Sequence, residues 1–511
     1  MVTDHAIIQN QYFDSVFLMR VAKRISAAEG IEQAAAVMAT AKNLEALAQA
    51  GFASAARGPA APNDVIVALR ATDSTHARAI LDHLDQWLNR EETPNSGTTV
   101  TTLSDALGVE PNANLAVISV PGEYAAREAR LALEQNLHVF LFSDNVSLED
   151  EVSLKQLSKE RGVLLMGPDC GTAIIGGAGI GFANSVRRGP VGVIGASGTG
   201  LQEITTLVHR MGSGISHAIG TGSHDLTDAV GGVTSMQALD ALDAEPNTKV
   251  IVLVSKPPGQ VTLGRIRQRM ASMSKPVITC FLGSSGLEEH WPHPAHDLTE
   301  SASEAVRLAG VAPTLLPGSY PSVSSAVAEI GPHRRYVRGL FAGGTFCYQA
   351  QQIFREAGVT VHSNEPLSRS LKLADPYRSV GHSLVDMGAD VFTVGRPHPM
   401  IDSTLRAQRV EAEARYPETA ILLLDFVLGF SASADPVGDL APAIKRAREQ
   451  AEGQGNRLLV LSSVCGTELD AQGFNRQIQA LEQAGVTVFP SAVDASRFAA
   501  AVAIELGKVG R

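Results

Sequence analysis

Residues 191–200 read VGVIGASGTG, and this stretch decides the fold of the 511-residue chain. Its apolar half predicts a buried strand, and its glycine-rich half predicts a turn into the amphipathic helix Leu201–Met211, which stops at Gly212. Ser197 or Thr199 is the expected N-cap. A helix that starts in such a turn offers free N–H groups and a positive dipole end, which suits phosphate. No Lys follows, so the stretch is not a Walker A loop.

The same pattern returns 146 positions later. Residues 337–345 (VRGLFAGGT) predict a second strand that ends in glycines, before a helix over Phe346–Ala357. The turn threonine and the glycine that ends the helix are thirteen positions apart in both copies. A second echo pairs residues 163–172 (VLLMGPDCGT) with residues 458–467 (LLVLSSVCGT). These repeats are consistent with internal duplication of an α/β unit, or with glycine-rich turns of the kind that commonly join strands to helices.

The composition is typical of an α/β enzyme, with 44% hydrophobic and 19% charged residues. The net charge of −11, without a basic block, argues against nucleic acid and anionic membranes as partners. No apolar run approaches the ~20 residues of a membrane span, and residues Met1–Asn10 lack the basic and apolar regions of a signal peptide, so we expect a cytoplasmic protein. Four cysteines without a CxxC pair do not make a disulfide framework.

Strands that alternate with helices predict an α/β fold of several domains, with doubly wound parallel sheets. Ligands then bind at the carboxyl ends of the strands. The expected parts are a small amino-terminal α/β domain (1–100), a Rossmann-like domain (112–185), a flavodoxin-like domain (186–312), a linker (313–334) and a second flavodoxin-like domain (335–511). Within them we expect a strand at Ser15–Val21 and a structured loop at Val380–Pro399.

Several motifs resemble a known enzyme. Residues 163–177 (VLLMGPDCGTAIIGG), the Ser-Gly-Thr turn and Gly220-Thr-Gly222 resemble the α subunit of succinyl-CoA synthetase across roughly residues 112–312. The last domain resembles the carboxy-terminal ligase domain of its β subunit. The extra amino-terminal domain and the string VGRPHPMID at 394–402 look like the FdrA family. The resemblance implies a partial Rossmann-like CoA-binding domain and two ligase domains of the synthetase type.

The chain also departs from the synthetases. Residues 1–111 lack their glycine-rich CoA loop, and no part resembles their ATP-grasp domain. Their phosphohistidine loop is replaced by residues 283–297 (GSSGLEEHWPHPAHD), where His290, His293 and His296 do not form the family motif. The spacing of these histidines could bind a metal, but histidines flanked by Pro and Trp in a loop without a supporting carboxylate are more often surface residues, so we expect no metal. The losses argue against a self-sufficient CoA ligase.

The resemblance implies that two helix starts, one from each ligase domain, converge on a phosphoryl group. The phosphate-binding candidates are Ser197, Gly198, Thr199, Gly343, Gly344 and Thr345. Arg396, in a Pro-flanked loop, is the candidate clamp for a substrate carboxylate, and His398 or His382 is the candidate proton donor. His382 and Asp386 would form an acid–base pair if their segment were helical. Asp169, Cys170, Gly222 and Cys465, at predicted strand ends, are candidates for substrate binding, although the cysteines would equally be small buried residues.

FdrA-like proteins encoded beside genes of allantoin (purine) catabolism are associated with oxamate carbamoyltransferase, which converts oxalurate and phosphate to oxamate and carbamoyl phosphate. The resemblance therefore implies a phosphate-dependent carbamoyl or acyl transferase with a small carboxylate or ureido substrate. Inorganic phosphate is its substrate and no cofactor is required. The alternatives are an acyl-CoA synthetase, which alone would use CoA and ATP, and a non-catalytic scaffold. We expect a hetero-oligomer with subunits from neighbouring genes, or a homo-oligomer.

Overall fold

The structure is a computed structural model of the chain. It describes residues 1–511 except 12, 14, 89–99, 284–290, 315, 317, 319, 332, 394, 395, 454–456, 510 and 511. The chain divides into two compact units, which are described separately. The first comprises Met1–Val109 and Ala389–His398, and the second comprises Glu110–Gly388 and Pro399–Arg511.

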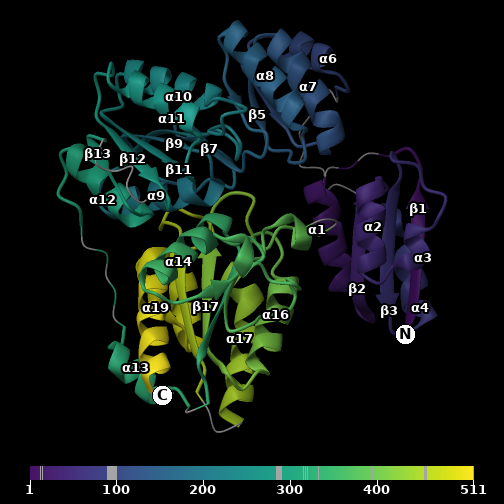
Figure 1. The fold of residues 1–511 in the computed structure, drawn as a ribbon. Coiled ribbons are helices and arrows are strands. Elements are labelled where there is room, and N and C mark those ends of the chain that lie inside the picture. Colours follow the sequence, from purple (N-terminus) through teal and green to yellow (C-terminus); the bar gives the residue numbers. More distant parts are fainter. Residues whose placement is uncertain are drawn as a thin grey trace. The chain divides into compact units, whose positions relative to one another are not determined.

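The first unit is built on an antiparallel sheet in the order β1-β3-β2 (Figure 1). Its elements are β1 (Val2–Ile8), α1 (Ser15–Ser26), β2 (Ile31–Met38), α2 (Ala41–Gln49), α3 (Ala53–Ala56), β3 (Val65–Ala71), α4 (Ser74–Leu81), α5 (Leu84–Leu88), α6 (Leu103–Val109) and α15 (Asp390–Thr393). The strand predicted at Ser15–Val21 is wrong, because the apolar pattern continues as a helical one: Leu18, Val21 and Ile25 lie on one buried face of α1.

The second unit begins with a small parallel sheet in the order β4-β5-β6. Its elements are β4 (Leu115–Ile118), α7 (Gly122–Glu134), β5 (His138–Leu141), α8 (Leu148–Arg161) and β6 (Leu165–Met166).

A seven-stranded sheet follows, in the order β13-β12-β11-β9-β10-β7-β8. Its elements are β7 (Thr172–Ile175), β8 (Ala178–Gly181), β9 (Arg188–Gly195), α9 (Gly198–Arg210), β10 (Ile215–Gly220), α10 (Val233–Ala244), β11 (Val250–Ser255), α11 (Gln260–Met270), β12 (Val277–Phe281), β13 (His293–Pro294) and α12 (Leu298–Leu308). The antiparallel β7–β8 hairpin pairs with β10, so this sheet begins before residue 186, where we expected the domain to start.

The last sheet is wholly parallel, in the order β15-β16-β14-β17-β18-β19. Its elements are β14 (Tyr336–Phe341), α14 (Gly344–Glu356), β15 (Val361–His362), the 3₁₀ turn η2 (Arg369–Leu371), β16 (His382–Asp386), α16 (Thr404–Ala414), β17 (Thr419–Val427), α17 (Pro436–Gly453), β18 (Leu459–Cys465), α18 (Phe474–Gln483), β19 (Thr487–Phe489) and α19 (Ala492–Val509), with α13 (Val323–Glu329) before the sheet and packed on α19.

The prediction of a loop over Val380–Pro399 is wrong in part. Residues 382–386 form strand β16, because Leu384 and Val385 are fully buried between β14 and β15 in the sheet. The doubly wound architecture is confirmed, with helices on both faces of the two large sheets (Figure 1). The last sheet is parallel throughout, whereas the seven-stranded sheet is parallel from β13 to β10 and antiparallel at β7 and β8. Along β11, Val252 packs into one hydrophobic cluster and Leu253 into another, which shows that both faces are buried.

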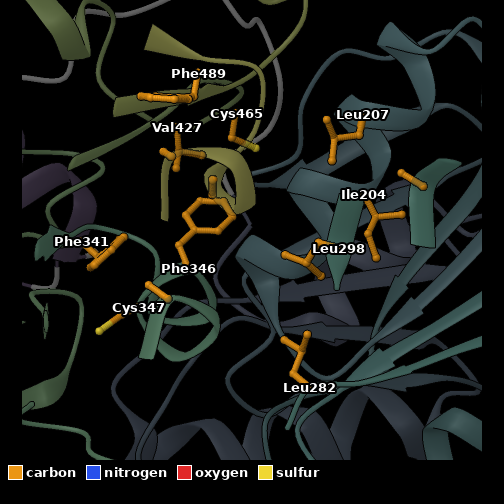
Figure 2. Close-up of a cluster of buried hydrophobic side chains, with 14 of the residues drawn as sticks. Ile204, Leu207, Leu282, Leu298, Phe341, Phe346, Cys347, Val427, Cys465 and Phe489 are labelled. Atoms are coloured by element: carbon orange, nitrogen blue, oxygen red, sulfur yellow. The ribbon is translucent and has the colours of Figure 1, made fainter. Parts of the chain in front are cut away.

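The two large sheets of the second unit share one hydrophobic core. Ile204 and Leu207 on α9 belong to the same buried cluster as Phe346 on α14 and Val427 on β17 (Figure 2). α9 also packs directly on α14. This shared core fixes the position of one sheet relative to the other, and so fixes the two glycine turns that precede these helices.

Candidate active site

The first glycine turn forms a capped helix start. Ser197 is the N-cap of α9, and its Oγ accepts a hydrogen bond from the Gly200 N–H at 3.3 Å. The turn leaves room only for glycine at position 195, because a Cβ there would lie 2.8 Å from the Leu201 side chain. The strand thus delivers the first N–H groups of α9 to the carboxyl edge of the sheet, where a parallel α/β sheet binds ligands.

The second glycine turn is held by a buried ion pair. The carboxylate of Asp425 accepts hydrogen bonds from the N–H groups of Ala342 and Gly343, at 2.8 and 2.9 Å. Arg406 Nη2 donates to Asp425 Oδ1 at 2.7 Å, and Arg406 Nε donates to the Leu340 carbonyl at 2.9 Å. Burial raises the pKa of Asp425, while Arg406 and the N–H donors oppose that rise. This pair, which we call the turn brace, aligns the start of α14.

Sequence reasoning missed the turn brace, although a signal was present. Asp425 interrupts the apolar run of residues 420–428, AILLLDFVL, and a carboxylate in a buried strand requires a partner. The sequence does not show which of its many arginines supplies the partner.

The two helix starts meet. Ser197 Oγ and Thr345 Oγ1 are hydrogen-bonded to each other across the two domains. A Cβ at Gly343 would lie 3.0 Å from Thr199 Cγ2, and one at Gly200 would lie 3.4 Å from Thr345 Cγ2. The N-cap residue of α14 is Gly343, which has no side chain to accept a hydrogen bond. The N–H groups in the first turn of α14 are therefore not capped by this residue. The convergence that the resemblance implied is present, and phosphate binding there stays a prediction.

A buried hydroxyl also faces the start of α9. Thr172, on β7, is 1% exposed, and among the described residues its Oγ1 has no hydrogen-bond partner. This oxygen lies 3.4 Å from the position that a Cβ at Gly198 would take. A buried hydroxyl without a partner costs free energy, so an anion at this helix start would supply the missing acceptor.

The predicted substrate-binding residues occupy two places. Asp169, with φ of +55°, and Cys170 lie on the turn after β6, and this turn packs on Gly222, where a Cβ would lie 2.3 Å from the Pro168 carbonyl oxygen. Cys465 lies at the end of β18, 3.7 Å from Thr206 Oγ1.

The cysteines do not fit a nucleophile. Burial raises the pKa of Cys170 to about 12 and the pKa of Cys465 well above its ordinary value, so both stay thiols at neutral pH. The alternative of small buried residues fits them better.

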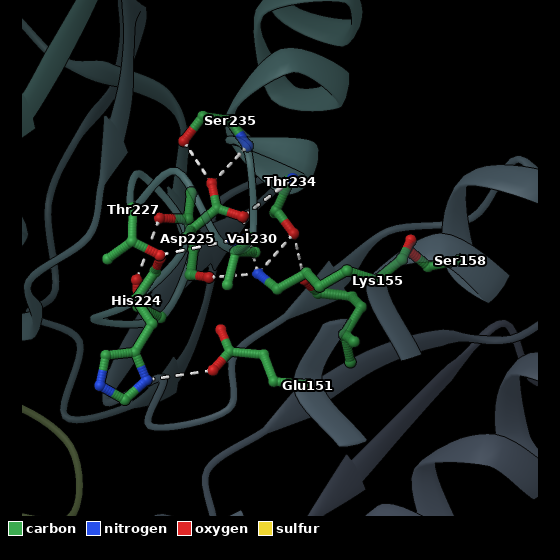
Figure 3. Close-up of polar contacts among 12 residues, drawn as sticks. Glu151, Lys155, Ser158, His224, Asp225, Thr227, Val230, Thr234 and Ser235 are labelled. Atoms are coloured by element: carbon green, nitrogen blue, oxygen red, sulfur yellow. Dashed lines mark hydrogen bonds and ion pairs between the residues drawn. The ribbon is translucent and has the colours of Figure 1, made fainter. Parts of the chain in front are cut away.

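The loop at Gly222 is held by a buried lysine (Figure 3). Lys155 Nζ donates to the Thr221 carbonyl at 2.6 Å, to Asp225 Oδ1 at 2.9 Å and to Thr234 Oγ1 at 2.8 Å. All three donors of the ammonium group are therefore satisfied. Lys155 ties α8 of the small sheet to the loop after β10, which is a positioning role.

His382 does not lie at the paired helix starts, which corrects its predicted catalytic role there. It occupies the amino end of β16, where its Nδ1 accepts a hydrogen bond from the Val337 N–H at 3.1 Å. Because the segment is a strand, His382 and Asp386 lie about 13 Å apart at ~3.3 Å per residue and cannot form the acid–base pair. Burial and the nearby Arg338 and His362 lower the pKa of His382 to about 4.

Arg396 and His398 belong to the first unit, whereas both helix starts belong to the second. The Arg396 N–H donates to the Thr393 carbonyl at 3.0 Å. Desolvation lowers the pKa of His398 to about 4, so its imidazole is neutral at pH 7. A neutral imidazole is a poor proton donor, which argues against the predicted role of His398 in protonating a leaving group.

The structure places His293, one of the histidines of residues 283–297, away from the helix starts. His290 lies outside the described residues. His293 is on the edge strand β13, where its Nδ1 lies 3.6 Å from Glu304 Oε1. Three strand spacings of ~4.8 Å, or about 14 Å, separate β13 from β9. The described residues contain no group of three or more His, Cys, Asp or Glu able to hold a metal ion, and no described helix could span a membrane.

Three family models match the chain. They are "CoA-ligase" over residues 340–502, "CoA binding domain" over residues 186–278, and "AllF, heavy metal-associated domain" over residues 1–103. The CoA-binding match includes the glycine turn before α9 and falls outside residues 112–185, to which we assigned the CoA-binding resemblance. Residues 1–103 contain no cysteine, and no donor cluster occurs among the described ones, so they do not fit the metal in the family's description.

The chain is similar to succinate–CoA ligase [ADP-forming] subunit alpha 2 of Archaeoglobus fulgidus, with 30% identity over 176 residues, 33% of this chain and 58% of that protein. Among solved structures, it is similar to acetyl-coenzyme A synthetase 1 of Ca. Korarchaeum cryptofilum, with 17% identity, a TM-score of 0.28, and coverage of 78% of this chain and 83% of the other. It is 40% identical over 491 residues, 95% of each chain, to YahF of Escherichia coli strain K12. The chain therefore belongs to the family of YahF, FdrA-like fusions of an AllF-type amino-terminal domain with CoA-binding and CoA-ligase domains.

Proposed function

We propose that this protein transfers an acyl group between phosphate and the thiol of CoA, the phosphate-handling half of an acid–thiol ligase. The contact between Ser197 and Thr345 carries the proposal, because it brings the N-termini of two helices to one point. Each dipole end contributes about 0.3–2 kcal/mol to holding an anion. The matches to the CoA-binding and CoA-ligase families support the thiol as the second partner.

Each group of the site has a part in this chemistry. The N–H groups of both first turns bind the phosphate oxygens, and the hydroxyls of Ser197 and Thr345 turn from each other to the anion. Thr172 donates its free hydroxyl. An oxygen of the bound phosphate attacks the thioester carbonyl, the carbonyl oxygen takes up negative charge, and the CoA thiolate leaves to give an acyl phosphate. The separation of His293 from β9 favours direct attack by phosphate over a relay through a phosphorylated His293.

The experiment is phosphorolysis by the full-length chain. Succinyl-CoA and acetyl-CoA are incubated with phosphate, and free CoA and acyl phosphate are measured together. We expect both products in equal amounts, and we expect Ser197→Ala with Thr345→Val to abolish them. Ser322→Ala is the matched control, because Ser322 caps α13 by the same hydrogen bond, to the Ser325 N–H at 3.1 Å. Free CoA without acyl phosphate would indicate hydrolysis and contradict the proposal.

Carbamoyl transfer from a ureido acid such as oxalurate uses the same bound phosphate and is the other substrate hypothesis. The comparisons give it no specific support, and CoA has no part in it. The same assay separates the two hypotheses: carbamoyl phosphate formed from oxalurate and phosphate, with no reaction of either thioester, would replace acyl transfer by carbamoyl transfer.

A further inference from the structure

Asp386 lies against the first residue of α14. A Cβ at Gly344 would lie 2.7 Å from Asp386 Oδ2, so only glycine leaves room for this carboxyl group. Asp386 Oδ1 accepts a hydrogen bond from the Gly388 N–H at 2.9 Å, and Oδ2 is the oxygen that faces the helix start. The backbone of Asp386 is fixed by Asn364, whose side chain bonds to both its N–H and its carbonyl at 2.9 Å.

The charges around Asp386 are of both signs. Glu365 and Asp425 face it and disfavour its ionised form. Lys256, which follows β11 in the other domain, attracts it. The Lys256 Nζ lies 5.1 Å from the ring centroid of Tyr348, in the first turns of α14, so both ionisable groups flank the same helix start. The buried thiol of Cys347 also lies near.

We propose that Asp386 is a ligand of the phosphate site and binds the anion in its protonated form, so that one proton is taken up at Asp386 when the anion binds. The inference rests on the proposed phosphate site. A dianion at the start of α14 would be repelled by an ionised carboxylate, whereas the protonated acid donates a hydrogen bond from Oδ2 to an anion oxygen. The balance is Asp386 carboxylate plus H⁺ plus dianion giving the carboxylic acid with the dianion bound.

In the free protein, Asp386 changes its protonation state near neutral pH. Burial, with Glu365 and Asp425, raises the pKa of Asp386 to about 7 against the opposing effects of the Gly388 N–H and Lys256. About 90% of the acid form is present at pH 6 and about 10% at pH 8. Because the apparent affinity is proportional to the fraction of protein molecules in which Asp386 is protonated, the Kd for a dianion should rise about tenfold from pH 6 to pH 8.

The test is calorimetric titration of the full-length chain with sulfate, which stays a dianion over this range, so that only protons on the protein are counted. At pH 8, titrations in buffers of different ionisation enthalpy should show uptake of about 0.9 proton per sulfate. Asp386→Asn, which keeps a neutral donor, should bind sulfate with the same Kd at pH 6 and pH 8. Asp375→Asn, at an exposed carboxylate of the same domain, should keep the tenfold change.

The outcomes separate this inference from the proposed function. Sulfate binding without proton uptake in the unmodified chain would overturn the role of Asp386 and leave the phosphate site standing. No binding of either sulfate or phosphate would overturn the phosphate site itself, and the inference with it. The measurement on the unmodified chain decides the question even if Asp386→Asn does not fold.

Discussion

Replacing Arg406 with Met should destabilise the protein and weaken its phosphate site together. Arg406 is 3% exposed, and Asp425 is 1% exposed. Without the guanidinium, the Asp425 carboxylate stays buried with two N–H donors and no cation, and the Leu340 carbonyl loses its donor. Removing one partner of a buried pair costs about 3–5 kcal/mol.

The assay is urea unfolding followed by circular dichroism, combined with sulfate titration. Arg446→Met is the matched control, because Arg446 pairs with Glu411 at the surface, with side chains 59% and 29% exposed. An exposed pair contributes about 0–1 kcal/mol. Equal losses of stability in the two variants, or unchanged sulfate affinity in Arg406→Met, would refute the turn brace.

The Arg406→Met defect should also depend on pH. Burial already raises the pKa of Asp425 in the folded state, and loss of Arg406 raises it further. When the pKa of a carboxyl group is higher in the folded than in the unfolded state, ionisation lowers the free energy of unfolding, and this loss grows as pH rises above the pKa of the unfolded state. The stability difference from the unmodified protein should therefore shrink as pH falls towards the raised pKa of Asp425.

Three further outcomes follow from the described contacts. Thr172→Val should leave stability unchanged or higher, since it removes an unpartnered buried hydroxyl, and should raise the phosphate Kd about tenfold in calorimetry. His382→Gln should lower the free energy of unfolding by about 1 kcal/mol, because the hydrogen bond from the Val337 N–H is disturbed, and should leave the phosphate Kd unchanged. A large rise in that Kd would show that His382 belongs to the phosphate site. The four cysteines, whose burial raises the pKa of every one of their thiols, should not react with a thiol reagent in the native protein; one fast-reacting thiol would contradict their burial.

The parallel architecture and the two helix starts could be predicted from sequence because they depend on local patterns. The strand and glycine turn of residues 191–200 are local, and so is their repeat at residues 337–345. The contact between Ser197 and Thr345 could be predicted only through a resemblance, since nothing local shows that two residues 148 positions apart along the chain meet.

The errors have physical causes as well. Ser15–Val21 is too short to separate a strand from the first half of a helix, and the apolar periodicity beyond it decides for the helix. His382 and Asp386 are four apart, a spacing that brings side chains together only in a helix, and burial in the sheet made the segment a strand. The pairing of Asp425 with Arg406 and the closeness of Asp386 to Gly344 depend on tertiary packing alone.

One phosphate should bind where the two glycine turns meet. A crystal structure of the protein grown with tungstate, a tetrahedral dianion with strong anomalous scattering, tests it directly. We expect an anomalous peak within hydrogen-bonding distance of the turns at residues 197–199 and 343–345. A tungstate bound only elsewhere, or none at saturating concentration, would contradict it.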